Sequence, residues 1–166
     1  MGRAAKLSHI SPDGRPRMVD VSAKPPTERA AAAEAWVDVG PAVARLLRAS
    51  GAVAKGNVLD AARLAGVMGA KQTPYLIPLC HPLPLDFVQV DARVVGRRVR
   101  IVATVRCEAK TGVEMEAMTA ASVAALTVYD MVKSAGRGVQ IGPVRLLEKR
   151  GGKSGRWRRE ARDGAR

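Results

Sequence analysis

Alternating and helically spaced apolar residues divide this chain into seven expected elements. Alternation towards Trp36 predicts a first strand, and alternation on both sides of Gly96 and Arg97 predicts an antiparallel hairpin. Three- and four-residue spacing predicts helices. The expected elements are strand 31–39, helix 41–48, helix 57–68, strand 87–95, strand 98–107, a long helix within 110–133 and strand 141–147. This order, β, α, α, β, β, α, β, predicts an α+β fold, a ferredoxin-like sandwich in which helices pack on one side of an antiparallel sheet.

Prolines and polar residues set the expected boundaries. Pro41 suits the first turn of a helix, and Asn57 is a suitable N-cap for the next one. Lys55 is expected in the Gly-containing loop between these helices. From 73 to 85 four prolines predict an irregular loop, because proline lacks a backbone N–H and restricts the residue before it. They are Pro74, Pro78, Pro82 and Pro84.

The long helix has apolar residues on two sides. One stripe is expected to pack on the sheet and consists of Met118, Ala121, Ala125, Val128 and Val132. The reverse side carries Ala120, Val123, Ala124, Leu126 and Thr127. We therefore expect a second covering layer from another chain or domain.

Asp130 and Lys133 lie on that second side, three residues apart. Their spacing allows an ion pair that could also act as a proton-transfer couple. The alternative is an ordinary surface salt bridge, which is the commoner role of such a pair. The apolar surroundings favour the functional interpretation.

Composition limits the class of protein. With 166 residues and an apolar fraction of 47%, the chain suits one globular domain. Its two cysteines, Cys80 and Cys107, without a spaced Cys/His array, predict a reducing compartment and argue against a disulfide framework and a structural zinc site. We expect no metal and no cofactor. No segment is expected to cross a membrane and the start lacks a secretory signal, so we expect a cytoplasmic protein.

The net charge of +13 is concentrated at the two ends of the chain. We expect a flexible N-terminal extension over 1–16, a single catalytic domain over 17–155 and a flexible basic tail over 156–166. The tail could hold RNA or keep the protein in solution. Since it has one Trp and no repeating aromatic residues, the second role is favoured, and nucleic acid is not the expected partner.

Seven blocks of sequence stand out along the chain. They are RMVDVSAK (17–24), KG (55–56) before AARLAG, IPLCHPL (77–83), KTGVEMEA (110–117), ALTVYDMVK (125–133), IGPVRLLEK (141–149) and GGKSG (151–155). These blocks resemble those of the cyclic pyranopterin monophosphate synthases, the molybdenum cofactor biosynthesis protein C family, and occur in the family's order. The resemblance runs from about residue 17 to 155.

This resemblance implies a reaction, an assembly and a fold. Members of the family convert 3′,8-cyclo-7,8-dihydroguanosine 5′-triphosphate into cyclic pyranopterin monophosphate and release pyrophosphate. Their fold is ferredoxin-like, and they assemble as a hexamer, a trimer of dimers, with active sites at subunit interfaces. Such an assembly would account for the second apolar side of the long helix.

The resemblance also implies the roles of particular residues. Asp130, Lys133 and Lys55 match catalytic positions. The expected substrate-binding residues are Leu79, Cys80, His81, Glu114, Met115, Glu116, Lys71, Arg29 and Lys153. Among them the cationic groups would stabilise the departing pyrophosphate, and the glutamates could accept hydrogen bonds from a guanine-like edge.

Plainer explanations exist for several of these residues. Paired glutamates at a helix start interact favourably with the helix dipole, a histidine among prolines is often structural, and loop lysines are usually solvated. GGKSG is not a Walker motif, because Leu147 stands where the first glycine should be. Asn57 stands where the family usually has Asp; it preserves helix capping but removes a negative partner for Lys55.

Two other functions remain open at this point. A basic ferredoxin-like domain could bind RNA on its sheet, although the hairpin strands offer only Phe87 as an aromatic platform. The chain could instead be a non-catalytic oligomeric scaffold that kept the pocket.

Overall fold

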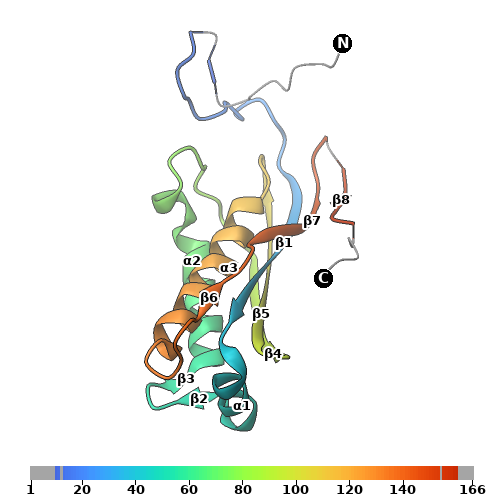
Figure 1. Cartoon of the computed structure of the whole chain (residues 1–166). Helices are drawn as coiled ribbons and strands as arrows, with labels where there is room; N and C mark the ends of the chain where they lie inside the picture. The colour runs from blue at the N-terminus through green and yellow to red at the C-terminus, as the bar shows by residue number, and fades with distance from the viewer. Residues whose placement is uncertain (1–9, 12, 154, 161–166) are drawn as a thin grey trace.

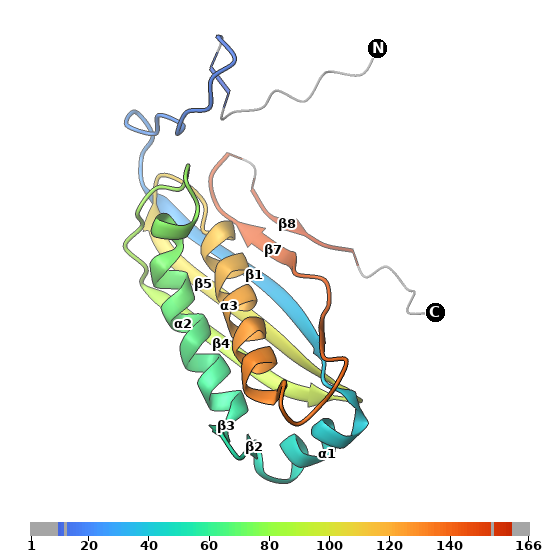
Figure 2. The ribbon, with the colours of Figure 1, turned by 60° about the vertical axis from the view of Figure 1, so that its left-hand side comes forward.

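A six-stranded sheet with helices on one face forms most of the described structure, and a separate two-stranded sheet, β2-β3, lies beside it (Figure 1). The computed structural model describes residues 10–11, 13–153 and 155–160. Its elements are β1 (Thr27–Asp38), α1 (Gly40–Ser50), β2 (Ala52–Val53), β3 (Gly56–Asn57), α2 (Val58–Leu76), β4 (Phe87–Val95), β5 (Arg98–Ala109), α3 (Glu114–Val132), β6 (Gln140–Ile141), β7 (Arg145–Arg150) and β8 (Trp157–Arg158). Helices α2 and α3 lie side by side across the sheet, as both ribbon views show (Figure 2).

The sheet is antiparallel and has β1 near its centre. Its strand order is β4-β5-β1-β7-β8, and β6 pairs with the end of β1. β1 pairs with β5 along its whole length, from Thr27 opposite Ala109 to Asp38 opposite Arg98. The expected ferredoxin-like α+β class, with helices on one side of the sheet, is confirmed.

Small side chains let the helices lie close to the sheet and to each other. Ala31, Ala33 and Ala35 of β1 are buried under the helices. Ala121 and Ala125 of α3 are buried as well. Because alanine projects one methyl group, the backbones approach closely and lose little side-chain entropy on folding. The stripe of α3 that was predicted to face the sheet does so, with Met118 only partly buried.

α2 covers much of the second side of α3. A Cβ atom at Gly66 would lie 3.0 Å from the carbonyl oxygen of Ala120, and one at Gly69 would lie 2.9 Å from Val123. The two glycines therefore permit a close helix–helix contact. α2 of the same chain thus covers part of the side that was expected to meet another chain or domain, and Leu126 on this side remains exposed.

α2 is longer than predicted and includes Pro74. The prolines were expected to exclude regular structure from residue 73, but the helix continues to Leu76. Pro74 lies in the last turn, where its missing N–H removes a single helical bond. The N–H of Ile77 still donates to the carbonyl oxygen of Thr73 at 2.9 Å.

Strand boundaries also differ from those predicted. β1 begins at Thr27 instead of residue 31. The final predicted strand, 141–147, is two strands, because Pro143 cannot donate to a ladder and separates β6 from β7. Trp157 and Arg158, in the expected tail, form β8 and pair with Lys149 and Glu148. Residues 161–166 and 1–9 lie outside the described part of the chain.

Candidate active site

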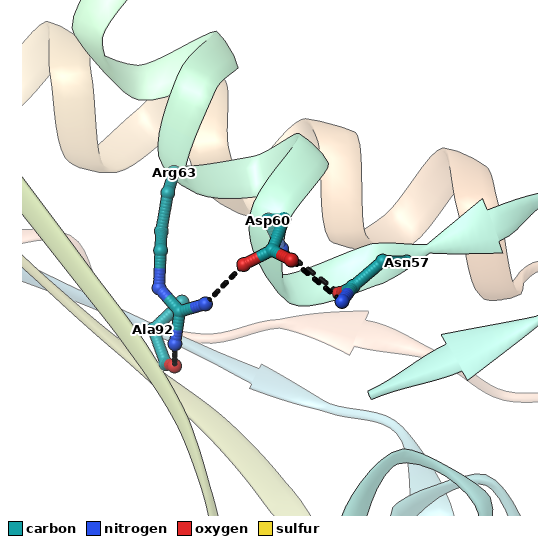
Figure 3. A network of polar contacts seen from close by, with 4 residues as sticks. All are labelled: Asn57, Asp60, Arg63 and Ala92. Carbon is teal, nitrogen blue, oxygen red and sulfur yellow. Dashed lines mark hydrogen bonds and ion pairs between the residues drawn. The ribbon is translucent and has the colours of Figure 1, made fainter. Parts of the chain in front are cut away.

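The start of α2 is fixed by a polar network that includes Asn57 (Figure 3). The Asn57 side-chain oxygen accepts from the Asp60 backbone N–H at 3.0 Å, and its amide nitrogen donates to Asp60 Oδ2 at 2.6 Å. Arg63 donates to Asp60 Oδ1 at 2.5 Å and to the carbonyl oxygen of Ala92 on the edge strand β4 at 2.7 Å. The network anchors α2 to the sheet, and it shows that Asn57 bonds to Asp60.

Lys55, Asp130 and Lys133 form one cluster, hereafter the lysine–aspartate cluster. Lys55 lies in the turn between β2 and β3, just before the α2 cap, and the other two residues lie at the end of α3. Lys133 Nζ is 2.6 Å from Asp130 Oδ1, and Lys55 Nζ is 3.6 Å from Asp130 Oδ2. Lys55 Nζ also donates to the Asp130 backbone carbonyl at 3.1 Å. The three predicted catalytic residues are therefore brought together.

Charge pairing governs the protonation of this cluster in the single chain. The hydrogen bond from Lys133, together with the charges of Lys133 and Lys55, lowers the pKa of Asp130. The hydrogen bond to Asp130 raises the pKa of Lys133. The side chains are exposed, at 45% for Lys55, 60% for Asp130 and 55% for Lys133. The expected apolar surroundings are absent from one chain, and the pKa of Lys133 moves away from neutrality.

A cavity of about 390 Å³ lies at the other end of α3. Its walls come from the first turn of α3, the loop after α2 and the segment before β1. The lining includes six of the predicted substrate-binding residues, Leu79, Cys80, His81, Glu114, Met115 and Glu116. Sequence reasoning thus found both long walls of this cavity, hereafter the α3-start cavity.

Glu116 is the most unusual group in the α3-start cavity. It is only 3% exposed, and among the described residues no other residue donates a hydrogen bond to its carboxylate or forms an ion pair with it. Burial raises its pKa above the usual value, a hydrogen bond from its own backbone N–H opposes this rise, and the charge of Glu114 adds to it. Burial and the charge of Glu116 raise the pKa of Cys80 beside it. Such a carboxylate needs a hydrogen-bond donor, which a ligand could provide.

Glu114 has a structural partner. Its Oε1 atom is 3.0 Å from Lys149 Nζ of β7, which ties the start of α3 to the sheet. Gly112 makes room for this carboxylate, because a Cβ there would lie 1.9 Å from Glu114 Oε2. Glu114 therefore orients the first turn of α3.

Arg29 and the Gly151–Gly152 turn contact each other at this same end of the domain. Arg29 donates to the carbonyl oxygens of Ala109 and Lys110 at 3.3 and 3.4 Å. A Cβ at Gly152 would lie 2.1 Å from Arg29 Nη1, so glycine is needed for the guanidinium to lie against the turn. Lys153 follows in this turn and is exposed.

The structure does not bring all the predicted site residues together. Glu114 and Asp130 are at opposite ends of α3, about 24 Å apart at the α-helical rise per residue. Lys71 is exposed on α2 and lines neither the α3-start cavity nor the lysine–aspartate cluster. Within one chain the expected shared pocket is therefore divided into two half-sites.

Sequence reasoning missed a third wall of the α3-start cavity, formed by Val19, Val21 and Lys24, and also missed Leu83, Thr111 and Gly112 on the two predicted walls. The residues of the third wall lie in the segment before β1. The signal was present, because all three belong to the RMVDVSAK block, and Val19 and Val21 alternate with exposed neighbours as in an extended segment.

Possible metal sites and membrane-spanning helices bear on the class of protein. No group of three or more His, Cys, Asp or Glu residues suited to a metal ion occurs in residues 10–11, 13–153 and 155–160. In the same part of the chain, no helix has the length and apolar character required to span a membrane. This ferredoxin-like domain holds ionisable side chains at both ends of one helix, and those at one end line a cavity. Such an arrangement is typical of an enzyme that uses acid–base catalysis.

Comparison with known proteins identifies the family. The chain belongs to the MoaC family, whose model matches residues 18–152. It is 52% identical to the cyclic pyranopterin monophosphate synthase of Thermomicrobium roseum, over 94% of this chain and 95% of that protein. It is 56% identical to the synthase of Streptomyces avermitilis, over 93% of this chain and 90% of that protein. It is also 52% identical to molybdenum cofactor biosynthesis protein 1 of Drosophila melanogaster, over 96% of this chain but 28% of that longer protein.

Proposed function

We propose that this chain converts 3′,8-cyclo-7,8-dihydroguanosine 5′-triphosphate into cyclic pyranopterin monophosphate and pyrophosphate. It is a lyase-type enzyme of molybdenum cofactor biosynthesis, as its family and its synthase relatives indicate. The reaction needs groups that move protons and cations that stabilise the departing pyrophosphate. The lysine–aspartate cluster and the α3-start cavity supply groups of both kinds.

One observation carries the proposal: the two half-sites lie at opposite ends of α3, on its outer surface. Met115 at one end is 39% exposed, and Leu126 and Tyr129 towards the other end are 58% and 40% exposed. α2 adds a parallel exposed stripe of Leu64, Met68 and Tyr75. An apolar surface of this kind marks an interface in a soluble domain.

A second copy related by a two-fold axis across α3 would complete the site. Two-fold packing of these helical faces runs the two α3 helices antiparallel. The start of one α3 then lies beside the end of the other, so the lysine–aspartate cluster of one chain faces the α3-start cavity of its partner. We propose such a dimer, and three dimers per hexamer, as the working form in the cytoplasm.

The residues divide into two functional groups within this composite site. Glu116, with Met115 and the loop residues Leu79 and Cys80, holds the guanine-derived rings. The phosphates lie towards the side chains of His81, Arg29, Lys71 and Lys153. Asp130, Lys133 and Lys55 transfer protons across the interface. Closure by the partner excludes water from Asp130 and Lys133, which strengthens their electrostatic interactions.

Turnover of the cyclic triphosphate tests the reaction directly. We expect wild-type protein to release pyrophosphate and the pterin product, and Asp130→Ala to lose turnover without losing assembly. An Asp130→Ala protein that retained wild-type turnover would contradict the role of Asp130. A wild-type protein that bound RNA with a steep salt dependence, and released no pyrophosphate, would instead favour the RNA-binding alternative.

Complementation tests the composite site. Asp130→Ala and Glu116→Ala chains, each inactive alone, should recover activity when they are co-expressed with different tags and purified through both. Random pairing puts half the chains into mixed dimers, each with one intact site of two, so roughly a quarter of wild-type activity is expected before tag selection. A site contained within one chain would show no recovery. The double variant Asp130→Ala/Glu116→Ala, co-expressed with wild type, is the matched control.

A further inference from the structure

A further cavity lies on the other side of the sheet. It has a volume of about 810 Å³, which falls in the usual range for small-molecule sites. Residues of β1, β5, β7 and β8 line it, and none of them belongs to the lysine–aspartate cluster or to the α3-start cavity. They are Glu34, Arg100, Arg145, Leu147, Trp157, Arg158, Arg159 and Glu160. We call this feature the arginine cavity.

A buried carboxylate orients two of the arginines. Glu34 is 2% exposed and lies between strands β5 and β7. Arg100 directs Nε and Nη2 to Glu34 Oε2 at 2.9 and 2.8 Å, and Arg145 directs the same two atoms to Oε1, both at 2.7 Å. The two guanidinium groups are thereby fixed across three strands. Such support from a buried acid is what a preorganised binding group requires.

Binding capacity remains after these bonds are formed. Among the described residues, Nη1 of Arg100 and of Arg145 makes no hydrogen bond to the protein. The two side chains are 27% and 46% exposed, so solvent or a ligand can reach them. Glu34 neutralises only one of the two positive charges. A cationic centre with free N–H donors therefore faces the cavity.

β8 supplies the remaining positive charge. Arg159 is held by a hydrogen bond of 2.8 Å from Nε to the carbonyl oxygen of Leu146 and lies over the Trp157 ring at 5.6 Å. Arg158 lines the same cavity and is exposed. With Glu34 and Glu160 counted, the four arginines leave the lining with a positive charge.

We propose that the arginine cavity binds a polyphosphate anion, either inorganic pyrophosphate or the phosphate chain of a nucleotide. Guanidinium groups match phosphate oxygens with paired N–H donors, and fixed arginines lose little entropy on binding. A second copy is a poorer occupant, because two-fold packing on this cavity would set arginine against arginine. RNA is also poorer, because the rings of Trp36 and Phe87 on this face are covered by Arg98 and Arg106 at 4.6 and 4.2 Å.

Intrinsic fluorescence provides a local assay. The chain has only two tryptophans, and both Trp36 and Trp157 lie on this face of the sheet. We expect a saturable change of tryptophan fluorescence when full-length protein is titrated with sodium pyrophosphate or with ATP at constant ionic strength. Trp157 pairs with Lys149, which contacts Glu114 of the α3-start cavity, so a response from the ends of α3 is separated from one at the arginine cavity by its dependence on Arg158. A pyrophosphate response without an ATP response would identify the free anion as the ligand, and tighter ATP binding would identify the nucleotide.

Two variants and a matched control test the assignment. Arg158→Glu removes a lining charge without touching Glu34, and Arg145→Gln removes one of the fixed guanidiniums. Each should weaken the binding roughly tenfold, the equivalent of one lost charge-assisted contact. Arg45→Glu makes the same charge change as Arg158→Glu on the exposed face of α1 and should leave the affinity unchanged. Turnover of the cyclic triphosphate should be unaffected by Arg158→Glu, which separates this site from the proposed active site.

Several outcomes would overturn the proposal. No saturable response, or equal weakening by Arg45→Glu and Arg158→Glu, would show that no defined anion site exists. If Arg145→Gln changed the sedimentation coefficient but left pyrophosphate binding unchanged, the face would be a contact between copies. If single-stranded RNA bound in an Arg158-dependent way while pyrophosphate and ATP did not, the face would be a nucleic-acid surface.

Discussion

Three glycines of one turn allow clash and backbone strain to be separated. Gly151, Gly152 and Gly155 all have positive φ, at 104°, 68° and 62°. A Cβ at Gly155 would meet nothing within 4 Å, one at Gly152 would meet the end of the Arg29 side chain, and one at Gly151 would lie 2.2 Å from the backbone oxygen of Glu28. Alanine at Gly155 therefore adds backbone strain alone. At Gly152 it adds the same strain and a clash with a side chain that can move, and at Gly151 it adds the strain and a clash with backbone that cannot move.

The expected free energies follow from this geometry. Gly155→Ala should lower the free energy of unfolding by about 1 kcal/mol, the strain of a left-handed alanine. Gly152→Ala should lose about the same stability, but it should raise KM for the cyclic triphosphate because Arg29 must move. Gly151→Ala should lose at least ~3 kcal/mol, since β7 must separate from β1 to relieve the overlap.

Urea unfolding followed by circular dichroism gives the three stabilities, and pyrophosphate release gives KM and kcat. Gly155→Ala is the internal control, because it shares the backbone strain without a contact. Equal losses of stability in Gly151→Ala and Gly155→Ala would show that the clash with the Glu28 backbone does not contribute. An unchanged KM in Gly152→Ala would remove Arg29 from substrate binding.

Further predictions concern charge. Asn57→Asp should lower the free energy of unfolding at pH 7 by about 0.5 kcal/mol, because a second carboxylate would face Asp60, and 1 M NaCl should reduce the loss. Glu34→Gln should cost about 2–3 kcal/mol at pH 7 in urea unfolding, less than a fully buried pair because its two arginine partners are partly exposed. Burial alone would raise the pKa of Glu34, but hydrogen bonds from those arginines lower it, so its stabilisation is present at neutral pH and is lost as pH falls. Cys107, buried and with a pKa raised to about 11 by burial, should resist iodoacetamide at pH 8 in native protein and react in urea, as mass spectrometry would show.

The order and type of the main elements could be predicted because their apolar periods are strong. Alternation in β4 and β5 indicated the hairpin, and Gly96 in its turn has a positive φ of 57°. The end of α2 could not be predicted, because a rule based on Pro74 ignores where in the helix the proline lies. The contact of Gly66 with α3 was also inaccessible, since it depends on a neighbour 54 positions away.

The candidate site was predicted from short blocks of sequence, and this prediction cannot include contacts between distant blocks. Lys133 and Asp130 contact each other because helical spacing requires it, and the two walls at Cys80 and Glu116 follow from the family resemblance. That Lys55 reaches Asp130 depends on the tertiary fold. The division into two half-sites depends on the length of α3 relative to the whole domain, which no single block contains.

The directions of the pKa shifts assign the acidic limb of the activity profile to Glu116. Asp130 has a lowered pKa, so it is already ionised at a pH where the carboxyl group of Glu116, whose pKa is raised by burial, still holds its proton. Hydrogen bonds from a guanine-like edge require the ionised form of Glu116. As pH rises through the pKa of Glu116, kcat/KM should therefore increase, and the Glu116→Gln variant should have a lower kcat/KM without this rise. Partner binding would exclude water from the cavity beside Glu116 and move the limb upward, so dilution to monomers should lower the pKa of Glu116, as ¹³C NMR would show. An acidic limb that survived in Glu116→Gln but disappeared in Asp130→Asn would reverse the assignment.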